Sequence, residues 1–200
     1  SNCLRVPFVR AVFPDALFIH LLREGRDVVE SSYRQWNSRP NWTYIARKAL
    51  TFPHIEAFGY ARYYAGYALR RSFRRAQAVK IDTWGPRYEG IDRDLADLDL
   101  LRVCALQWTK CVQKAATSLA QLTPDRAMTI HYEEFVQRPQ EHLERIACFA
   151  SIDPQPYANS PEVVSVTTSF VGKGRKNLNS DQLESIAPLM EDTLREWNYQ

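Results

Sequence analysis

The sequence has no apolar run of about 18 residues, which excludes an ordinary membrane-spanning helix. It has only four cysteines, Cys3, Cys104, Cys111 and Cys148, without a C-x-x-C pair or a neighbouring histidine pattern, so we expect no metal site. Cys104 and Cys111 lie seven residues apart in a helical pattern and are interpreted as packing residues. Four cysteines in 200 residues do not make a disulfide scaffold, which favours a reducing, cytoplasmic compartment.

Neither sign of charge dominates the composition. There are 26 Lys and Arg residues against 23 Asp and Glu residues, which gives a net charge of +3. This mild basicity suits a small polyanionic ligand and gives no indication of nucleic acid binding. Apolar residues make up 45% of the chain. A chain of 200 residues with this composition predicts a single globular domain, over residues 1–200, with a substantial core.

Hydrophobic periodicity predicts strands that alternate with helices. Short apolar runs rich in β-branched and aromatic residues predict strands at 16–22 and 127–132. Helical patterns cover 7–13, 28–36, 56–75, 95–122, 138–152 and 180–199, the last kinked or interrupted at Pro188, whereas 82–92 and 153–180 are expected to be irregular. The alternation predicts a three-layer α/β domain, with a parallel central sheet flanked by helices.

A cluster of charged and hydroxyl side chains follows the first expected strand, in the stretch REGRDVVESS at 23–32. Ligands of open parallel sheets bind beyond the carboxyl ends of the strands, and the first N–H groups of a helix that starts near Asp27 favour an anion. Arg23 and Ser31 lie eight residues apart across this strand-to-helix turn, so both side chains can reach one phosphate group. The alternative is that Arg23 pairs with Asp27 and the serine faces solvent, and spacing alone leaves both interpretations open.

The longer stretch FPDALFIHLLREGRDVVESS, at 13–32, resembles the 3′-phosphate-binding segment of sulfotransferases that use 3′-phosphoadenosine 5′-phosphosulfate (PAPS). In that family, the arginine that ends the strand and the serine eight residues later hold the 3′-phosphate of the donor. The resemblance therefore implies this role for Arg23 and Ser31. Glu24 departs from the Asp or Asn that the family usually has at this place.

Two later segments extend the resemblance. The stretch TIHYEEF, at 129–135, is similar to the family's strand-plus-tyrosine segment, which implies that Tyr132 lies against the adenine; a buried core tyrosine is the alternative. The stretch GKGRKNLNSDQL, at 172–183, is similar to a late basic loop that closes over the 3′-phosphate side, and it makes Lys173 and Arg175 candidates. Gly174 stands where that loop usually has a tryptophan.

The resemblance implies a P-loop nucleotide kinase-like fold and a reaction. A sulfuryl group would move by in-line displacement from PAPS to a hydroxyl or amine, and PAP (3′-phosphoadenosine 5′-phosphate) would leave. The acceptor would be a small molecule, a carbohydrate or a peptide. The sequence leaves two alternatives open: a non-catalytic module that binds PAP or another adenine nucleotide, and a relative of the P-loop nucleoside kinases.

Two elements of the family are not found in the sequence. No phosphate-binding loop of the GxxxxGK[ST] type or a similar type precedes residue 13. We therefore expect these residues to form roughly the C-terminal two-thirds of the family domain, incomplete at the N-terminus and inactive alone. No general base is assigned: His20 and His131 are expected to be satisfied core residues and His142 to lie on a surface helix, which leaves His54 as a loose candidate.

The acceptor side is expected in region 37–95. It carries a group of aromatic residues at helical spacing, for which a core role is the alternative: Tyr60, Tyr63, Tyr64, Tyr67 and Trp84.

Overall fold

The structure is a computed structural model that describes residues 2–37, 85–158 and 160–199. Several expectations lie outside the described residues: the helix at 56–75, the start of the loop at 82–92, the candidate base His54, and the five aromatic residues of region 37–95 named above.

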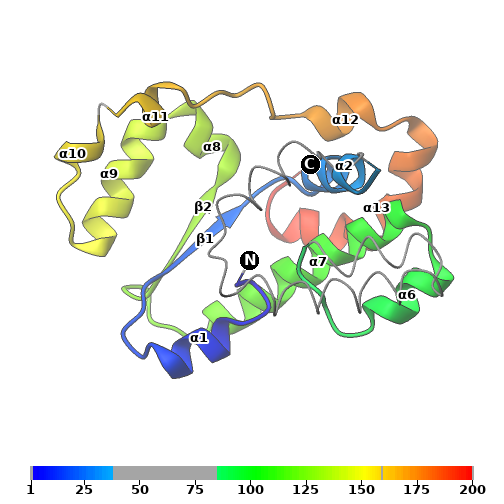
Figure 1. Ribbon diagram of the computed structural model, residues 1–200, viewed down its shortest axis with the longest axis horizontal. Helices are drawn as coiled ribbons and strands as arrows, with labels where there is room; N and C mark the ends of the chain where they lie inside the picture. The colour runs from blue at the N-terminus through cyan, green and yellow to red at the C-terminus, as the bar shows by residue number, and fades with distance from the viewer. Residues whose placement is uncertain (1, 38–84, 159, 200) are drawn as a thin grey trace, which may run out of the picture.

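A small parallel sheet lies between two groups of helices. Strand β1 (Phe18–Leu22) pairs with β2 (Ala127–His131), with Phe18 opposite Ala127 and Leu22 opposite His131. Figure 1 shows α8–α11 on one side of the strands and α2, α7 and α13 on the other. The described residues thus form an α/β fold, as the alternating pattern predicts, with two strands in the sheet.

The described helices follow the predicted pattern in part. Helix α8 (Tyr132–Gln137) was not predicted, and two further segments differ from the expectation. The pattern at 95–122 divides into two helices because Asp99 caps the second one, accepting the N–H of Arg102 at 3.0 Å. The segment 153–180, expected to be irregular, contains three short helices of four or five residues. The helices are α1 (Val6–Val12), α2 (Gly25–Asn37), α6 (Ile91–Asp97), α7 (Leu100–Leu119), α8 (Tyr132–Gln137), α9 (Pro139–Ala150), α10 (Gln155–Ala158), α11 (Pro161–Val164), α12 (Lys173–Asn177) and α13 (Ser180–Glu196).

Helix α7 organises the core. Its predicted apolar face is buried throughout, at Leu101, Ala105, Trp108, Val112 and Ala115. This face packs against α2 and α13, and each fully buried aliphatic side chain contributes about 1.5–3 kcal/mol. The packing is close at Gly25, the first residue of α2, where a Cβ atom would lie 2.4 Å from Cε of Met190 and 2.9 Å from the Trp108 ring. The start of α2 is therefore fixed against both other helices.

Helix α13 contains Pro188 without ending there. It begins with a capping box, in which Asn179 and Gln182 each accept the other's backbone N–H. Proline cannot donate to the preceding turn, which bends a helix. Figure 1 shows the first half of α13 and its second half running in different directions. The helix is therefore bent and not interrupted.

The four cysteines are free thiols. Cys104 is buried in the core, which confirms its packing role, and burial raises the pKa of its thiol to about 12. In the parts of the chain that the structure describes, no three His, Cys, Asp or Glu side chains gather in a way that could hold a metal ion. Across the same residues, no helix combines the length and the apolar character needed to cross a membrane.

Two of the three described histidines, His20 and His142, differ from the expectation. His131 fits it, because its Nδ1 lies 3.0 Å from the Tyr199 hydroxyl. His20 does not: its Nδ1 is buried and has no hydrogen-bond partner among the described residues. His142 was expected on a surface but is 1% exposed, because α8 and α9 pack together and bring the Phe135 ring to 6.2 Å from its imidazole.

His20 makes stability depend on pH. Burial, and to a lesser degree the nearby His131, lower the pKa of His20 below its ordinary value of 6.5. On acidification, His20 is therefore protonated in the unfolded chain before it is protonated in the folded protein. The contribution of neutral His20 to the free energy of unfolding is complete above pH 6.5 and is lost as the pH falls through the lowered pKa. We expect the stability difference between the protein and a His20→Gln variant to shrink on acidification. Urea unfolding of both proteins between pH 7 and 5 measures it, and a difference that is constant across this range would contradict the assignment.

Candidate functional site

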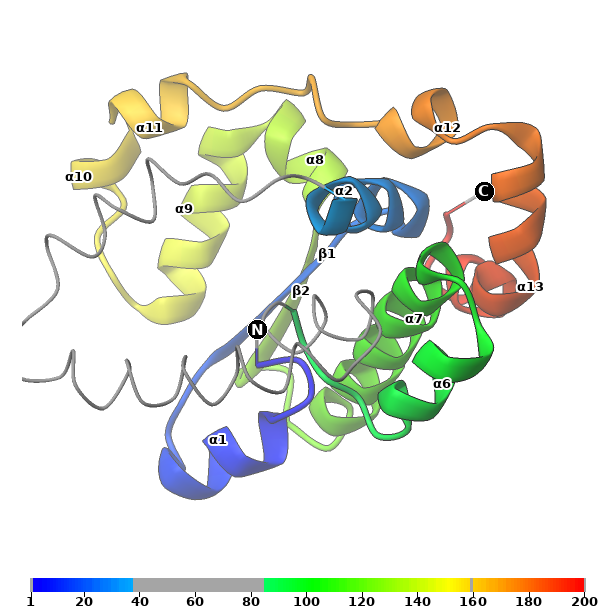
Figure 2. The same cartoon turned by 45° about the vertical axis from the view of Figure 1, so that its right-hand side comes forward.

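Three segments that are far apart in the sequence meet at the carboxyl ends of the two strands. They are the turn from β1 into α2, the start of α8 at Tyr132, and the stretch from Phe170 through α12. Figure 2 shows α8, α2 and α12 along this end of the sheet. Ligands of parallel sheets bind at this edge, so the structure brings the sequence-predicted segments to the expected place.

Arg23 joins these three segments. Its guanidinium carbon lies 4.6 Å from the centroid of the Tyr132 ring, and its Nη2 donates to the Phe170 carbonyl at 2.7 Å. The pairing with Asp27, which the sequence left as an alternative, is present only as a 3.9 Å contact. The Nε atom of Arg23 is buried and has no hydrogen-bond partner among the described residues. This N–H is therefore left without an acceptor among the described residues, and a ligand reaches it only if the surrounding side chains shift.

Asp27 fixes α12 against α2. This side chain is fully buried, and its two carboxylate oxygens accept the backbone N–H groups of Gly172 at 2.7 Å and of Gly174 at 2.6 Å. Gly174 packs so closely that a Cβ atom there would lie 2.2 Å from the carbonyl carbon of Arg26. Asp27 therefore accepts hydrogen bonds from the other segment and not from its own helix.

The chain's own carboxylates occupy the N-terminus of α2. The helix begins at Gly25, three residues before the predicted start, and the Glu24 side chain caps it by accepting the Asp27 N–H at 2.9 Å. The Glu24 N–H donates to Oε1 of Glu133 at 2.9 Å. The expectation that these N–H groups are free for an anion is therefore wrong for those of Glu24 and Asp27.

Lys173 and Arg175 open the short helix α12. The Lys173 ammonium lies 4.2 Å from the centroid of the Phe170 ring, and Arg23 donates to the backbone carbonyl of the same residue. Arg175 is exposed, and no contact described for these segments joins it to Arg23. Lys173 is thus placed beside Arg23, whereas Arg175 extends the positive charge along the surface.

Ser31 is the fifth predicted residue. It follows Asp27 by four positions and therefore shares one face of α2 with it. Asp27 faces Gly172 and Gly174, so this face of α2 is the one against which α12 packs. Ser31 is half-buried there.

Comparison with known families bears on the first of these segments. A family model described as "Sulfotransferase family" matches residues 1–89. This match supports a sulfotransferase family domain over residues 1–89. The sulfotransferase match includes Arg23 and Ser31, whereas Tyr132, Lys173 and Arg175 lie beyond it. Comparisons with curated proteins and with solved structures give no match.

Beside the sulfotransferase motif lies a hydrogen-bond network that sequence reasoning missed. The Tyr199 hydroxyl donates to Oε2 of Glu133 at 2.9 Å and also lies 3.4 Å from the Leu22 carbonyl. Burial and the negative charge of Glu133 raise the pKa of Tyr199, so it remains a neutral donor. Glu133 thereby connects Tyr199 to the Glu24 N–H at the start of α2. The two residues of each hydrogen-bonded pair in this network lie 66 or more residues apart, so local patterns give little signal of it. The acidic pair that follows Tyr132 is the local signal that could have indicated it.

Proposed function

We propose that the protein is a sulfotransferase that moves the sulfuryl group of PAPS to a hydroxyl or amine of an acceptor. The acceptor is a small molecule, a carbohydrate or a peptide. The observation that carries the proposal is the position of Arg23 at the carboxyl end of β1, over the Tyr132 ring and with a buried N–H unused among the described residues. The family match over the same segment supports it.

The residues of this edge fit the donor. A guanidinium binds phosphate through a charged, forked contact, and a phosphate oxygen is one acceptor that would satisfy the unpartnered Nε of Arg23. We assign Arg23 and Ser31 to the 3′-phosphate and Tyr132 to the adenine, since an aromatic ring at this edge can stack on a base. Lys173 and Arg175 contribute positive charge to the same phosphate from α12.

The donor supplies the activated sulfuryl group, and PAP is the leaving product. The part assigned to the residues above is to bind the donor and hold it in one orientation, which lowers the barrier by fixing the reacting groups in line. Asp27 supports this role indirectly, because its two hydrogen bonds hold the Lys173 segment next to Arg23.

Replacement of Arg23 by alanine is expected to weaken PAP binding. A hydrogen bond to a charged group contributes about 1.5–3 kcal/mol, which corresponds to roughly tenfold to a hundredfold in affinity. Adenosine 5′-phosphate lacks the 3′-phosphate, so its affinity should change little. Isothermal titration calorimetry with both nucleotides measures the two effects. Arg23→Lys keeps the charge without the forked contact, so its affinity for PAP should lie between that of the unchanged protein and that of Arg23→Ala.

Arg93→Ala is the matched control, because this arginine is 87% exposed on α6 and its removal changes the net charge equally. Equal weakening of both nucleotides by Arg23→Ala would contradict the 3′-phosphate assignment. Release of PAP from PAPS in the presence of a panel of phenols, sugars and peptides then tests the transfer itself. PAP binding that depends on Arg23, without release from PAPS with any acceptor, would favour the non-catalytic nucleotide-binding alternative.

A further inference from the structure

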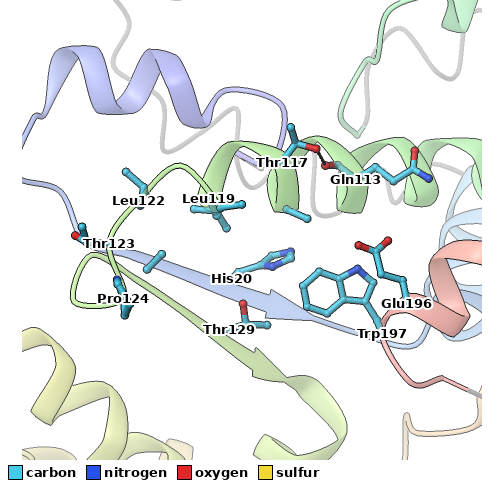
Figure 3. Close-up of a pocket in the computed structure, with 13 residues that line it drawn as sticks. His20, Gln113, Thr117, Leu119, Leu122, Thr123, Pro124, Thr129, Glu196 and Trp197 are labelled. Carbon is cyan, nitrogen blue, oxygen red and sulfur yellow. Dashed lines mark hydrogen bonds between the residues drawn. The ribbon is translucent and has the colours of Figure 1, made fainter.

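A cavity lies away from the candidate donor site. It has a volume of about 720 Å³, within the range of about 300–1,000 Å³ that is typical of small-molecule sites. It lies between the sheet, α7 and the end of α13, and Figure 3 shows the side chains that line it. Its lining includes Thr123 and Ala127, at the start of β2, whereas Arg23 and Tyr132 lie at the opposite ends of the strands. The two sites are therefore distinct.

The lining of this cavity carries negative charge only. Among the described residues that line it there is no Lys or Arg, and Glu196 is the one carboxylate. The neighbouring Arg195 does not neutralise it, because that guanidinium pairs with Glu191 at 2.8 Å and with Asp192 at 3.6 Å. An anion such as PAPS is therefore disfavoured here, and a cation is favoured.

Several donors of the lining are already used within the protein. The side-chain N–H of Gln113 donates to the Thr193 hydroxyl at 3.0 Å, and the Thr117 hydroxyl donates to the Gln113 carbonyl at 2.8 Å. The Thr123 hydroxyl donates to Asp125 and lowers the pKa of that carboxyl. These three donors are used within the protein, so the lone pairs of their oxygens remain for a ligand that brings N–H groups. The ring nitrogens Nε1 of Trp197 and Nδ1 of His20 are buried and have no partner among the described residues.

Aromatic and aliphatic side chains form the rest of the wall. The ring of Trp197 lies edge-to-face with that of His20, with centroids 5.7 Å apart, and Figure 3 shows both rings on the sheet side of the cavity. The lowered pKa of His20 keeps it neutral near pH 7, so it does not repel a cation. Leu119 and Leu122 supply an apolar surface at the other end.

We propose that this cavity binds a small organic amine, with its ammonium group at Glu196 and Trp197 and its apolar body against Leu119 and Leu122. An ammonium donates up to three hydrogen bonds, pairs with a carboxylate and is attracted to the face of an indole ring. The site does not depend on the sulfotransferase assignment, because it shares no residue with the donor-binding edge.

Three probes of similar shape test the proposal: 4-phenylbutylamine, 4-phenylbutanol and 4-phenylbutyrate. Ligand-observed NMR and calorimetry on the protein should show that the amine binds about threefold to tenfold more tightly than the alcohol, as expected for one exposed ion pair with a cation–π contact. The acid should bind most weakly. Glu196→Gln should reduce the affinity of the amine to that of the alcohol and leave the alcohol unchanged.

Glu184→Gln is the matched control, because Glu184 is also exposed on α13 but does not line the cavity. It should leave all three affinities unchanged, and thermal unfolding confirms that both variants are folded. Absence of amine binding at millimolar concentration, equal binding of amine and acid, or an unchanged amine affinity in Glu196→Gln would overturn the proposal. Saturation with PAP should not displace the amine, and displacement would overturn the separation of the two sites.

Discussion

Replacement of Asp27 by alanine is expected to lower the free energy of unfolding by about 3–6 kcal/mol, since two hydrogen bonds to a charged group are lost at about 1.5–3 kcal/mol each. The two N–H groups that lose their acceptor belong to Gly172 and Gly174, and that of Gly174 is buried. Water cannot replace the carboxylate at Gly174 unless α12 separates from α2. Urea unfolding measures the loss, and hydrogen exchange should become faster at residues 172–174 in particular.

Two variants make the Asp27 result specific. Asp27→Asn keeps one acceptor oxygen of similar shape and should lose about half as much stability. Asp97→Ala removes a carboxylate that is 65% exposed on α6, and it should change stability by less than about 0.5 kcal/mol. If Asp27→Ala and Asp97→Ala unfold at the same urea concentration, the buried carboxylate does not hold the two segments together.

The second large effect is expected at Gly174. In Gly174→Ala, the new Cβ would lie 2.2 Å from the carbonyl carbon of Arg26, 2.3 Å from its oxygen and 2.6 Å from the Asp27 nitrogen. These are backbone atoms of α2 and cannot rotate away as a side chain would. We expect α12 to move off α2, at a cost of about 3 kcal/mol or more from overpacking and the lost hydrogen bond to Asp27. Calorimetry should also show weaker PAP binding, because Lys173 moves with α12.

The control for Gly174 lies two residues earlier. Gly172 has a positive φ of 74°, and a Cβ atom added there would meet no other atom within 4 Å, so Gly172→Asn tests the same segment without the collision. Asparagine tolerates this backbone region, and only a small change is expected. Equal loss of stability in Gly172→Asn and Gly174→Ala would mean that the segment is sensitive to any substitution, and that the close contact with α2 is not the cause.

Local patterns predicted the parts of the fold that depend on local chemistry. The apolar run before Arg23 predicted β1, and the spacing from Leu101 to Ala115 predicted the buried face of α7, because burial on one face imposes the period of the element. The position of Arg23 and Ser31 across the β1–α2 turn followed from the same reasoning. Their assignment to a phosphate came from the resemblance, and the family match covers both residues.

The remaining features depend on contacts that no local pattern encodes. Helices α10, α11 and α12 have four or five residues each, too few for a periodic signal. His142 is polar and is typical of a surface residue, yet the packing of α8 on α9 buries it. The partners of Asp27 lie 145 and 147 residues away, so the sequence could suggest only local roles for it, such as pairing with Arg23.

The pairing of Asp27 with Gly174 also has a consequence for biosynthesis. The ribosome adds 147 further residues after Asp27 before Gly174, which carries the second donor, is part of the chain. At a translation rate of about 5–20 residues per second, that delay is roughly 7–30 s. During this time the Asp27 carboxylate lacks the donors with which it is buried in the folded protein, so we expect it to stay exposed to water. The edge that carries Arg23 is therefore synthesised well before the segment that completes its packing.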